Sequence, residues 1–300
     1  MIRILGTVFA GLVGLAFGSF LNVCLSRWPA GESVVKPRSH CRSCGRSLAW
    51  WENLPLVSWL ALRGRCRSCE AWIGWRYPLV EFAVGVLWAL SAWRMIGRFP
   101  NSVAPDFPIS YSPLLLLQTA ATFGGSLLFS WMLVGLAALD AEHLWLPDIV
   151  TLPGIVLGIV VSLLRGDSLL AESSPWQSML DQLLRIAFSI LIAAGLIFVI
   201  RWIYWLIRRR EGIGLGDAKL MAMLAAWLGL PGALLAFAIG VLLGALVGIA
   251  ILLRPNAGES AQATGLTQLP LGTFLCIGGI ISALWGAEIL SAYLRWSGLS

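Results

Sequence analysis

Apolar segments about 20 residues long recur along nearly the whole chain, and this recurrence limits the possible folds more than any other feature of the sequence. A helix of that length crosses the hydrocarbon core of a bilayer, where only helices and closed barrels satisfy their backbone polar groups. We expect transmembrane helices within residues 6–25, 78–93, 113–139, 149–164, 184–207 and 271–290. The stretch 218–253 is too long for one span, and Leu230-Pro231-Gly232 predicts a break that divides it into two.

The composition agrees with a membrane protein. Only 12% of the residues are charged, about half the share that is usual in soluble domains. The net charge of +6 would suit a nucleic-acid partner, but the basic residues flank apolar spans. We therefore expect no nucleic acid, and we expect the basic residues to interact with anionic membrane lipid. Residues 1–25 lack a small-residue cleavage site and are expected to stay as the first helix. The predicted fold class is an all-α polytopic membrane protein with about eight transmembrane helices.

Two Cys-x-x-Cys pairs occur in the polar loop that we assign to residues 26–77. Cys41 and Cys44 are separated from Cys66 and Cys69 by 21 residues, a spacing typical of a tetrahedral Cys₄ zinc ribbon. Two disulfides are the alternative, and they need an oxidising compartment. The loop is rich in arginine, which predicts a cytoplasmic location where thiols stay reduced. We therefore expect structural Zn²⁺.

Acidic side chains follow or precede apolar helices at two places farther along the chain. Asp140 directly follows the span 113–139, and Asp217 directly precedes the span that begins at residue 218. The number of spans between them and the cysteine-rich loop predicts that both lie on the cytoplasmic side. Two carboxylates that share one proton can activate water and polarise a peptide carbonyl, which is the chemistry of an aspartyl protease. Asp148 is expected to cap a helix, and Lys219 is expected to extend toward the headgroups.

Alternating glycines precede Asp217. Gly214 and Gly216 lack Cβ, so a peptide substrate could approach the backbone beside the carboxylate. A capping role alone would not require three alternating glycines, of which Gly212 is the first. A phosphate-binding loop is not indicated, because the glycines follow a membrane helix and not a strand.

These motifs occur together with others in the cysteine-rich loop. Gly214-Leu215-Gly216-Asp217 forms a GxGD sequence, and Asp140 is followed by Leu146-Pro147-Asp148. The combination resembles the type IV prepilin peptidases, which are leader peptidases and N-methyltransferases of pilus and type II secretion systems. The resemblance extends over about residues 10 to 280. One departure is Pro270-Leu271-Gly272-Thr273, where the family usually has Pro-Phe-Gly-Pro, and we assign no chemistry to this segment.

The resemblance implies a function. It implies that Asp140 and Asp217 cleave the basic leader of a prepilin or pseudopilin at the cytoplasmic face of the bacterial inner membrane, within a protease domain at residues 78–300. It also implies that the new N-terminal amine is methylated with S-adenosylmethionine, in a site that we expect to be separate and associated with the zinc loop. Four acids are candidates for binding the leader, although each could equally be structural: Glu52, Glu81, Glu142 and Glu211.

Two other classes of protein remain open at this point. A zinc-ribbon-bearing transporter could line an ion or headgroup path with Asp140 and Asp217, although transporters place such groups at broken helices in the middle of the membrane. A non-catalytic assembly protein of a secretion system could use zinc for stability alone. Alanine variants of the two aspartates would distinguish these classes.

Overall fold

The computed structural model describes residues 1–98, 113–165, 175–209, 214–253 and 269–298. These residues are almost entirely helical, and seven of their helices are long and apolar enough to cross a membrane. The prediction of an all-α polytopic membrane protein is confirmed. The chain forms two compact units, one of residues 1–112 and 126–135, the other of residues 113–125 and 136–300.

The break predicted in the stretch 218–253 is present, one residue earlier than expected. Helix α7 (Leu215–Leu252) contains Gly229 with φ 69° and ψ 176°, a conformation that favours glycine, and Pro231 follows it. Proline has no N–H for the helical ladder and its ring conflicts with the preceding turn, so the helix bends here. If α7 is counted as one span, the described residues contain seven candidate transmembrane spans. If its two arms are counted separately, they contain eight.

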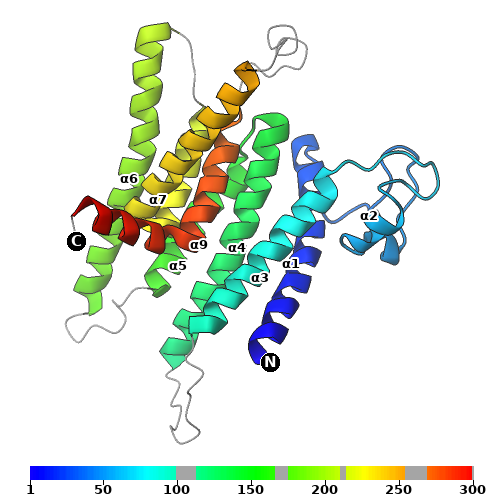
Figure 1. The fold of residues 1–300 in the computed structure, drawn as a ribbon, viewed down its shortest axis with the longest axis horizontal. Helices are drawn as coiled ribbons and strands as arrows, with labels where there is room; N and C mark the ends of the chain where they lie inside the picture. The colour runs from blue at the N-terminus through cyan, green and yellow to red at the C-terminus, as the bar shows by residue number, and fades with distance from the viewer. Residues whose placement is uncertain (99–112, 166–174, 210–213, 254–268, 299–300) are drawn as a thin grey trace, which may run out of the picture. The chain divides into compact units, whose positions relative to one another are not determined.

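The first unit is organised by α1 (Ile2–Arg27), which packs along α3 (Arg76–Arg98) (Figure 1). The close approach depends on glycine: a Cβ on Gly18 would lie 2.7 Å from the Cα of Glu81. Part of α4 (Pro113–His143) belongs to this unit, where Trp131 Nε1 donates to the carbonyl of Phe17. Small residues on α1, such as Gly14 and Gly18, thus allow the close backbone approach that is common between membrane helices.

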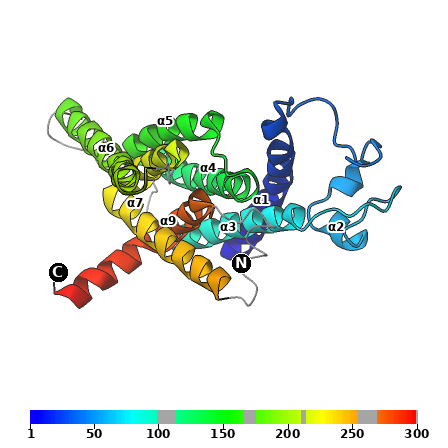
Figure 2. The same cartoon turned by 90° about the horizontal axis from the view of Figure 1, so that it is seen from above.

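The polar loop between α1 and α3 extends beyond the ends of these two helices and contains only short helical turns: η1 (Trp28–Ala30), η2 (Trp50–Asn53) and α2 (Val57–Ala61) (Figure 2). Three indole rings form its aromatic centre. The Trp59 ring lies 4.6 Å from that of Trp75 and 5.8 Å from that of Trp72, between ring centroids. Gly64, with φ 68°, leaves room for them, since a Cβ there would lie 2.8 Å from Trp72. The loop is therefore a folded domain, which we call the knuckle domain (residues 26–77).

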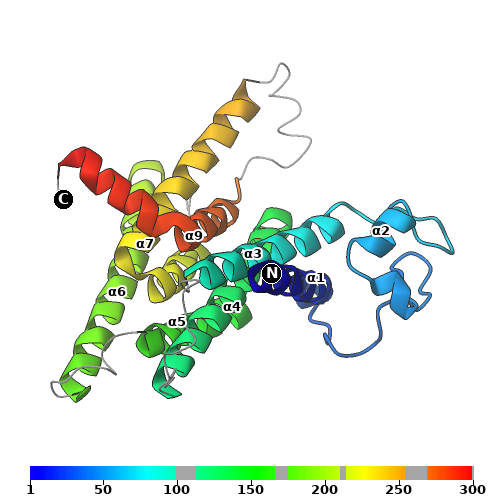
Figure 3. The ribbon, with the colours of Figure 1, turned by 60° about the horizontal axis from the view of Figure 1, so that its bottom comes forward.

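The second unit is built around α7, which contacts α5 (Asp148–Arg165), α6 (Pro175–Arg208) and α9 (Leu271–Ser297). Figure 3 shows α9 crossing α7. Gly240 permits this crossing, because a Cβ there would lie 3.1 Å from the Cα of Leu275. The first arm of α7 is enclosed by its neighbours, and Leu220, Met221 and Leu224 are fully buried. Asp217 lies in the first turn of this enclosed arm, which gives it a rigid support.

Candidate active site and metal site

Asp140 and Asp217 are brought together by the ends of two helices in the second unit. Asp140 lies in the last turn of α4 and Asp217 in the first turn of α7, and only 5% and 8% of their surfaces are exposed. Both line one cavity of about 450 Å³, a size typical of ligand pockets. Burying a carboxylate at the end of an apolar helix is costly, so two of them in one cavity indicate a functional site.

Asp140 is held by Thr273, near the start of α9. The backbone N–H of Thr273 donates to Oδ2 of Asp140 at 2.6 Å, and the Thr273 hydroxyl lies 3.1 Å from the same oxygen. The hydroxyl also lies 3.0 Å from the carbonyl oxygen of Ala137. One residue of α9 therefore contacts both the backbone and the carboxylate at the end of α4.

Gly272 makes the closest approach of α9 to this carboxylate. A Cβ on Gly272 would lie 2.9 Å from both Cγ and Oδ2 of Asp140, and 3.0 Å from Cδ1 of Leu146. Carbon atoms normally stay about 3.5 Å or more apart. Only glycine fits at this position with the present arrangement of Asp140.

Sequence reasoning missed this part of the site, because it assigned no chemistry to the segment 270–273. The available signal was the departure from the family pattern at Thr273, a polar residue in the first turn of an apolar helix. That signal does not indicate which carboxylate the threonine contacts, since Thr273 and Asp140 are 133 residues apart in the sequence.

The two glycines expected to admit substrate both line the cavity. A Cβ on Gly214 would lie 3.6 Å from Oδ2 of Asp217, so this backbone faces the carboxylate directly. Gly216 has an additional packing reason, because a Cβ there would lie 3.1 Å from the Cβ of Leu146. Gly212 lies outside the described residues.

Asp148 and Lys219 also line the cavity, and they pair with each other. Lys219 Nζ lies 2.6 Å from Oδ1 of Asp148, which is the first residue of α5. The sequence did not predict this partner for Lys219, whose ammonium is bound by a partly exposed carboxylate. The pair connects the first turn of α7 to the first turn of α5.

The acids considered as leader-binding residues have different surroundings. Glu81 is buried and accepts a hydrogen bond from the Leu56 N–H at 2.8 Å, and Glu52 is buried beside Arg46. Both carboxylates are therefore already engaged with groups of the chain itself. Glu142 lies 3.9 Å from His143 and remains partly exposed, whereas Glu211 lies outside the described residues.

The four cysteines of the knuckle domain form one cluster. The Sγ atoms of Cys41, Cys44, Cys66 and Cys69 all lie within 4.8 Å of one another, and those of Cys41 and Cys69 are 3.7 Å apart. A tetrahedral ion with Zn–S bonds of about 2.3 Å requires sulfur atoms about 3.8 Å apart, so the cluster fits a metal ion. A disulfide needs about 2.05 Å, and all six cysteines of the chain are free. The cluster can bind a metal, and the predicted disulfide alternative is not what the structure shows.

The backbone around the sulfurs also suits a metal. Cys41 N–H donates to Arg46 O and Cys66 N–H to Ala71 O, both at 2.9 Å, so each Cys-x-x-Cys segment forms the same turn. Backbone N–H groups of Cys69 and Ser68 lower the pKa of the Cys66 thiol to about 6. These donors favour the thiolate, which is the form that binds metals.

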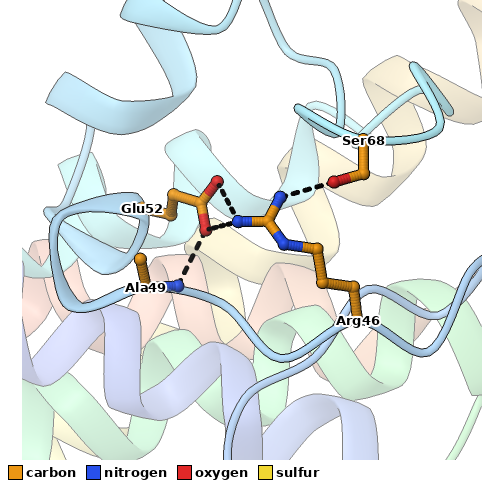
Figure 4. A network of polar contacts seen from close by, with 4 residues as sticks. All are labelled: Arg46, Ala49, Glu52 and Ser68. Atoms are coloured by element: carbon orange, nitrogen blue, oxygen red, sulfur yellow. Dashed lines mark hydrogen bonds and ion pairs between the residues drawn. The ribbon is translucent and has the colours of Figure 1, made fainter.

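A polar network connects the two turns (Figure 4). Arg46, from the first turn, donates to the Ser68 hydroxyl in the second at 2.6 Å and lies 3.1 Å from Oε2 of Glu52. The Glu52 side chain is only 2% exposed and also accepts the Ala49 N–H at 2.7 Å. Arg46 therefore holds the two cysteine turns in register while neutralising a buried carboxylate.

The family models and the relatives that match this chain indicate one family. Residues 12–95 match the Bacterial Peptidase A24 N-terminal domain, and residues 127–249 match the Type IV leader peptidase family. A protein of Pseudomonas aeruginosa named prepilin leader peptidase/N-methyltransferase is 34% identical over 96% of this chain and 93% of its own length. Proteins with the same name from Stutzerimonas stutzeri (32% identical, 96% and 93% covered) and Myxococcus xanthus (36%, 87% and 67%) are also similar. No solved structure matches the chain.

Proposed function

The chain belongs to the type IV leader peptidase family, and from this premise we propose that it cleaves the leader peptide of a type IV prepilin or pseudopilin and N-methylates the new N-terminal residue. The predicted resemblance is confirmed by these matches. The alternatives of a transporter and of a non-catalytic assembly protein are not favoured, because the similar proteins that span the chain are named as enzymes.

We assign the peptidase chemistry to Asp140 and Asp217. The observation that carries this assignment is that two buried carboxylates from different helix ends line one cavity. With one proton between them, the ionised carboxylate takes a proton from water while the protonated one donates to the scissile carbonyl oxygen. The water oxygen bonds to the carbonyl carbon, and the C–N bond then breaks as the leaving amine takes a proton. Gly214 and Gly216 leave the backbone beside Asp217 open to the substrate peptide.

The test of the peptidase assignment is a cleavage assay on a type IV prepilin in membranes or detergent. Asp140→Asn and Asp217→Asn should each abolish cleavage at normal protein levels, since an amide can neither accept nor relay the proton. Asp181→Asn is the matched control, because Asp181 is an exposed acid on α6. Cleavage near the wild-type rate in either variant of the pair would refute the assignment.

We propose that the methyl donor is S-adenosylmethionine and that the methyl-transfer site is separate from the aspartates. Methyl transfer to the new N-terminal amine requires the neutral form of that amine. A site of low dielectric would favour the neutral amine over the ammonium. Asp217→Asn enzyme given a pre-cleaved pilin and labelled S-adenosylmethionine should still form methylated product. No product from this variant, with the wild type active on the same substrate, would mean that the aspartates serve both reactions.

We also propose that the cysteine cluster holds one structural Zn²⁺ and that the knuckle domain and both aspartates lie on the cytoplasmic side of the inner membrane. Nine basic and three acidic side chains occur in residues 26–77, which accounts for the whole formal excess of +6 and favours the cytoplasm. Two long apolar helices separate this domain from Asp140, and two more separate Asp140 from Asp217, and this even count supports placing all three on one side. Labelling of single cysteines in intact cells against permeabilised cells would test this sidedness.

A further inference from the structure

Thr273 is placed where it can determine how Asp140 is oriented. Helix α9 begins at Leu271, so the N–H of Thr273 is one of the first-turn donors that have no partner within the helix. Here that donor is used by Oδ2 of Asp140, at 2.6 Å, and the hydroxyl of the same residue lies 3.1 Å from the same oxygen. The N–H and the hydroxyl of Thr273 therefore both lie within hydrogen-bonding distance of one carboxylate oxygen, while the hydroxyl, with its single proton, also lies 3.0 Å from the Ala137 carbonyl.

Two donors on one oxygen have a specific effect on a catalytic carboxylate. An Asp side chain can rotate about χ1 and χ2, and exchange of its two oxygens would change which one faces the reacting atoms. A short bond from a backbone N–H fixes one oxygen, because the helix end that supplies it does not move independently. Oδ1 is then the oxygen left for water and for the second aspartate.

We propose that Thr273 is a positioning residue for the peptidase reaction, which holds Oδ2 of Asp140 so that Oδ1 performs the proton transfer. The inference rests on the proposed function, and it adds a residue whose segment carried no assigned chemistry in the sequence. It also departs from the usual family pattern described above, which has proline at this position, and proline has neither an N–H nor a hydroxyl.

A purely structural role is the competing explanation. The Thr273 hydroxyl lies 3.0 Å from the Ala137 carbonyl, so the residue could serve only to attach α9 to α4. The two explanations differ in what they predict. Loss of an attachment lowers stability and the amount of folded enzyme, whereas loss of positioning lowers kcat of the folded enzyme and leaves KM unchanged.

The experiment is a graded series of variants assayed for kcat and KM on a prepilin substrate. Thr273→Ser keeps both donors and should stay within about twofold of the wild-type kcat, while Thr273→Val keeps the N–H alone and should lose about threefold to tenfold. Thr273→Pro removes both donors and should lose about tenfold to a hundredfold, again with KM unchanged. Proline is tolerated in the first turn of a helix, and the valine and serine variants decide the question if the proline variant does not fold.

The matched control is Ser282→Ala, also on α9. Ser282 is buried and its hydroxyl donates to the Gly232 carbonyl at 2.8 Å, so its removal also breaks a hydrogen bond between helices. This variant should lower the melting temperature and leave kcat and KM unchanged. Three results would each overturn the proposal. The valine or proline variant could keep the wild-type kcat, or the serine variant could be as impaired as the valine variant. The third is a loss of kcat in Ser282→Ala equal to that of the Thr273 variants. If the wild-type enzyme cleaves no prepilin, the proposed function itself is refuted and this role with it.

Discussion

Replacing Gly272 with alanine adds one methyl group at the closest approach between α9 and the carboxylate of Asp140. The new Cβ would lie 2.9 Å from Cγ and Oδ2 of Asp140 and 3.0 Å from Cδ1 of Leu146. Since carbon atoms are normally separated by about 3.5 to 4.0 Å, Asp140 would have to move by about 0.6 Å or more. Its Oδ2 is already bonded to the Thr273 N–H at 2.6 Å, so this movement would also lengthen that bond.

The effect on activity should exceed the effect on stability. A displacement of about 1 Å in a catalytic group can cost about 100-fold in rate, so we expect kcat of Gly272→Ala to fall by roughly 30-fold to 100-fold. Overpacking costs about 1–3 kcal/mol, and the better helix propensity of alanine returns up to about 1 kcal/mol. The net loss of stability is therefore about 3 kcal/mol or less, which leaves most of the protein folded.

The assay is prepilin cleavage with purified enzyme, together with a thermal denaturation curve for each variant. Gly195→Ala on α6 is the matched control, because a Cβ on Gly195 would contact nothing within 4 Å. It should keep full activity and lose no stability. A Gly272→Ala enzyme that cleaves at a rate close to the wild type would show that Asp140 does not need its present position, and the geometric argument for the site would be wrong.

Three further outcomes are expected. Asp148→Asn removes the partly exposed ion pair with Lys219, so in melting experiments it should lower the stability by less than about 1 kcal/mol. The variant should keep most cleavage activity, and abolished cleavage would place Asp148 in the reaction. The wild type is expected to bind one zinc ion per chain, and Cys44→Ser should bind much less and have a lower thermal stability. Full zinc content of the variant in elemental analysis would contradict the Cys₄ site. Arg46→Met leaves the buried Glu52 without its cationic partner and should cost about 1–3 kcal/mol in chemical denaturation, with an unchanged midpoint arguing against the network.

The sequence by itself determined the features that depend on local order along the chain. The presence of a span follows from an apolar run and the kink in α7 from Pro231 and Gly229, so both were predictable, although some helices extend up to nine residues beyond the expected spans. The cysteine cluster was predictable for a related reason, because the Cys-x-x-Cys spacing is that of a recognised metal-binding turn. Asp140 and Asp217 were proposed as site residues because acids beside apolar helices are costly and rarely present without a function.

Only the tertiary structure decided which side chains meet. Gly272 and Thr273 contact Asp140 across more than 130 residues, and Lys219 pairs with Asp148, 71 residues away. The partners of Glu52 and Glu81 likewise became known only from the groups that surround them in the fold. Helical periodicity specifies the face on which a residue lies, but the partner of that face depends on how the helices pack and at what register. The register of α9 against α4 is determined by many contacts at once, so the sequence near Thr273 contains no local signal for it.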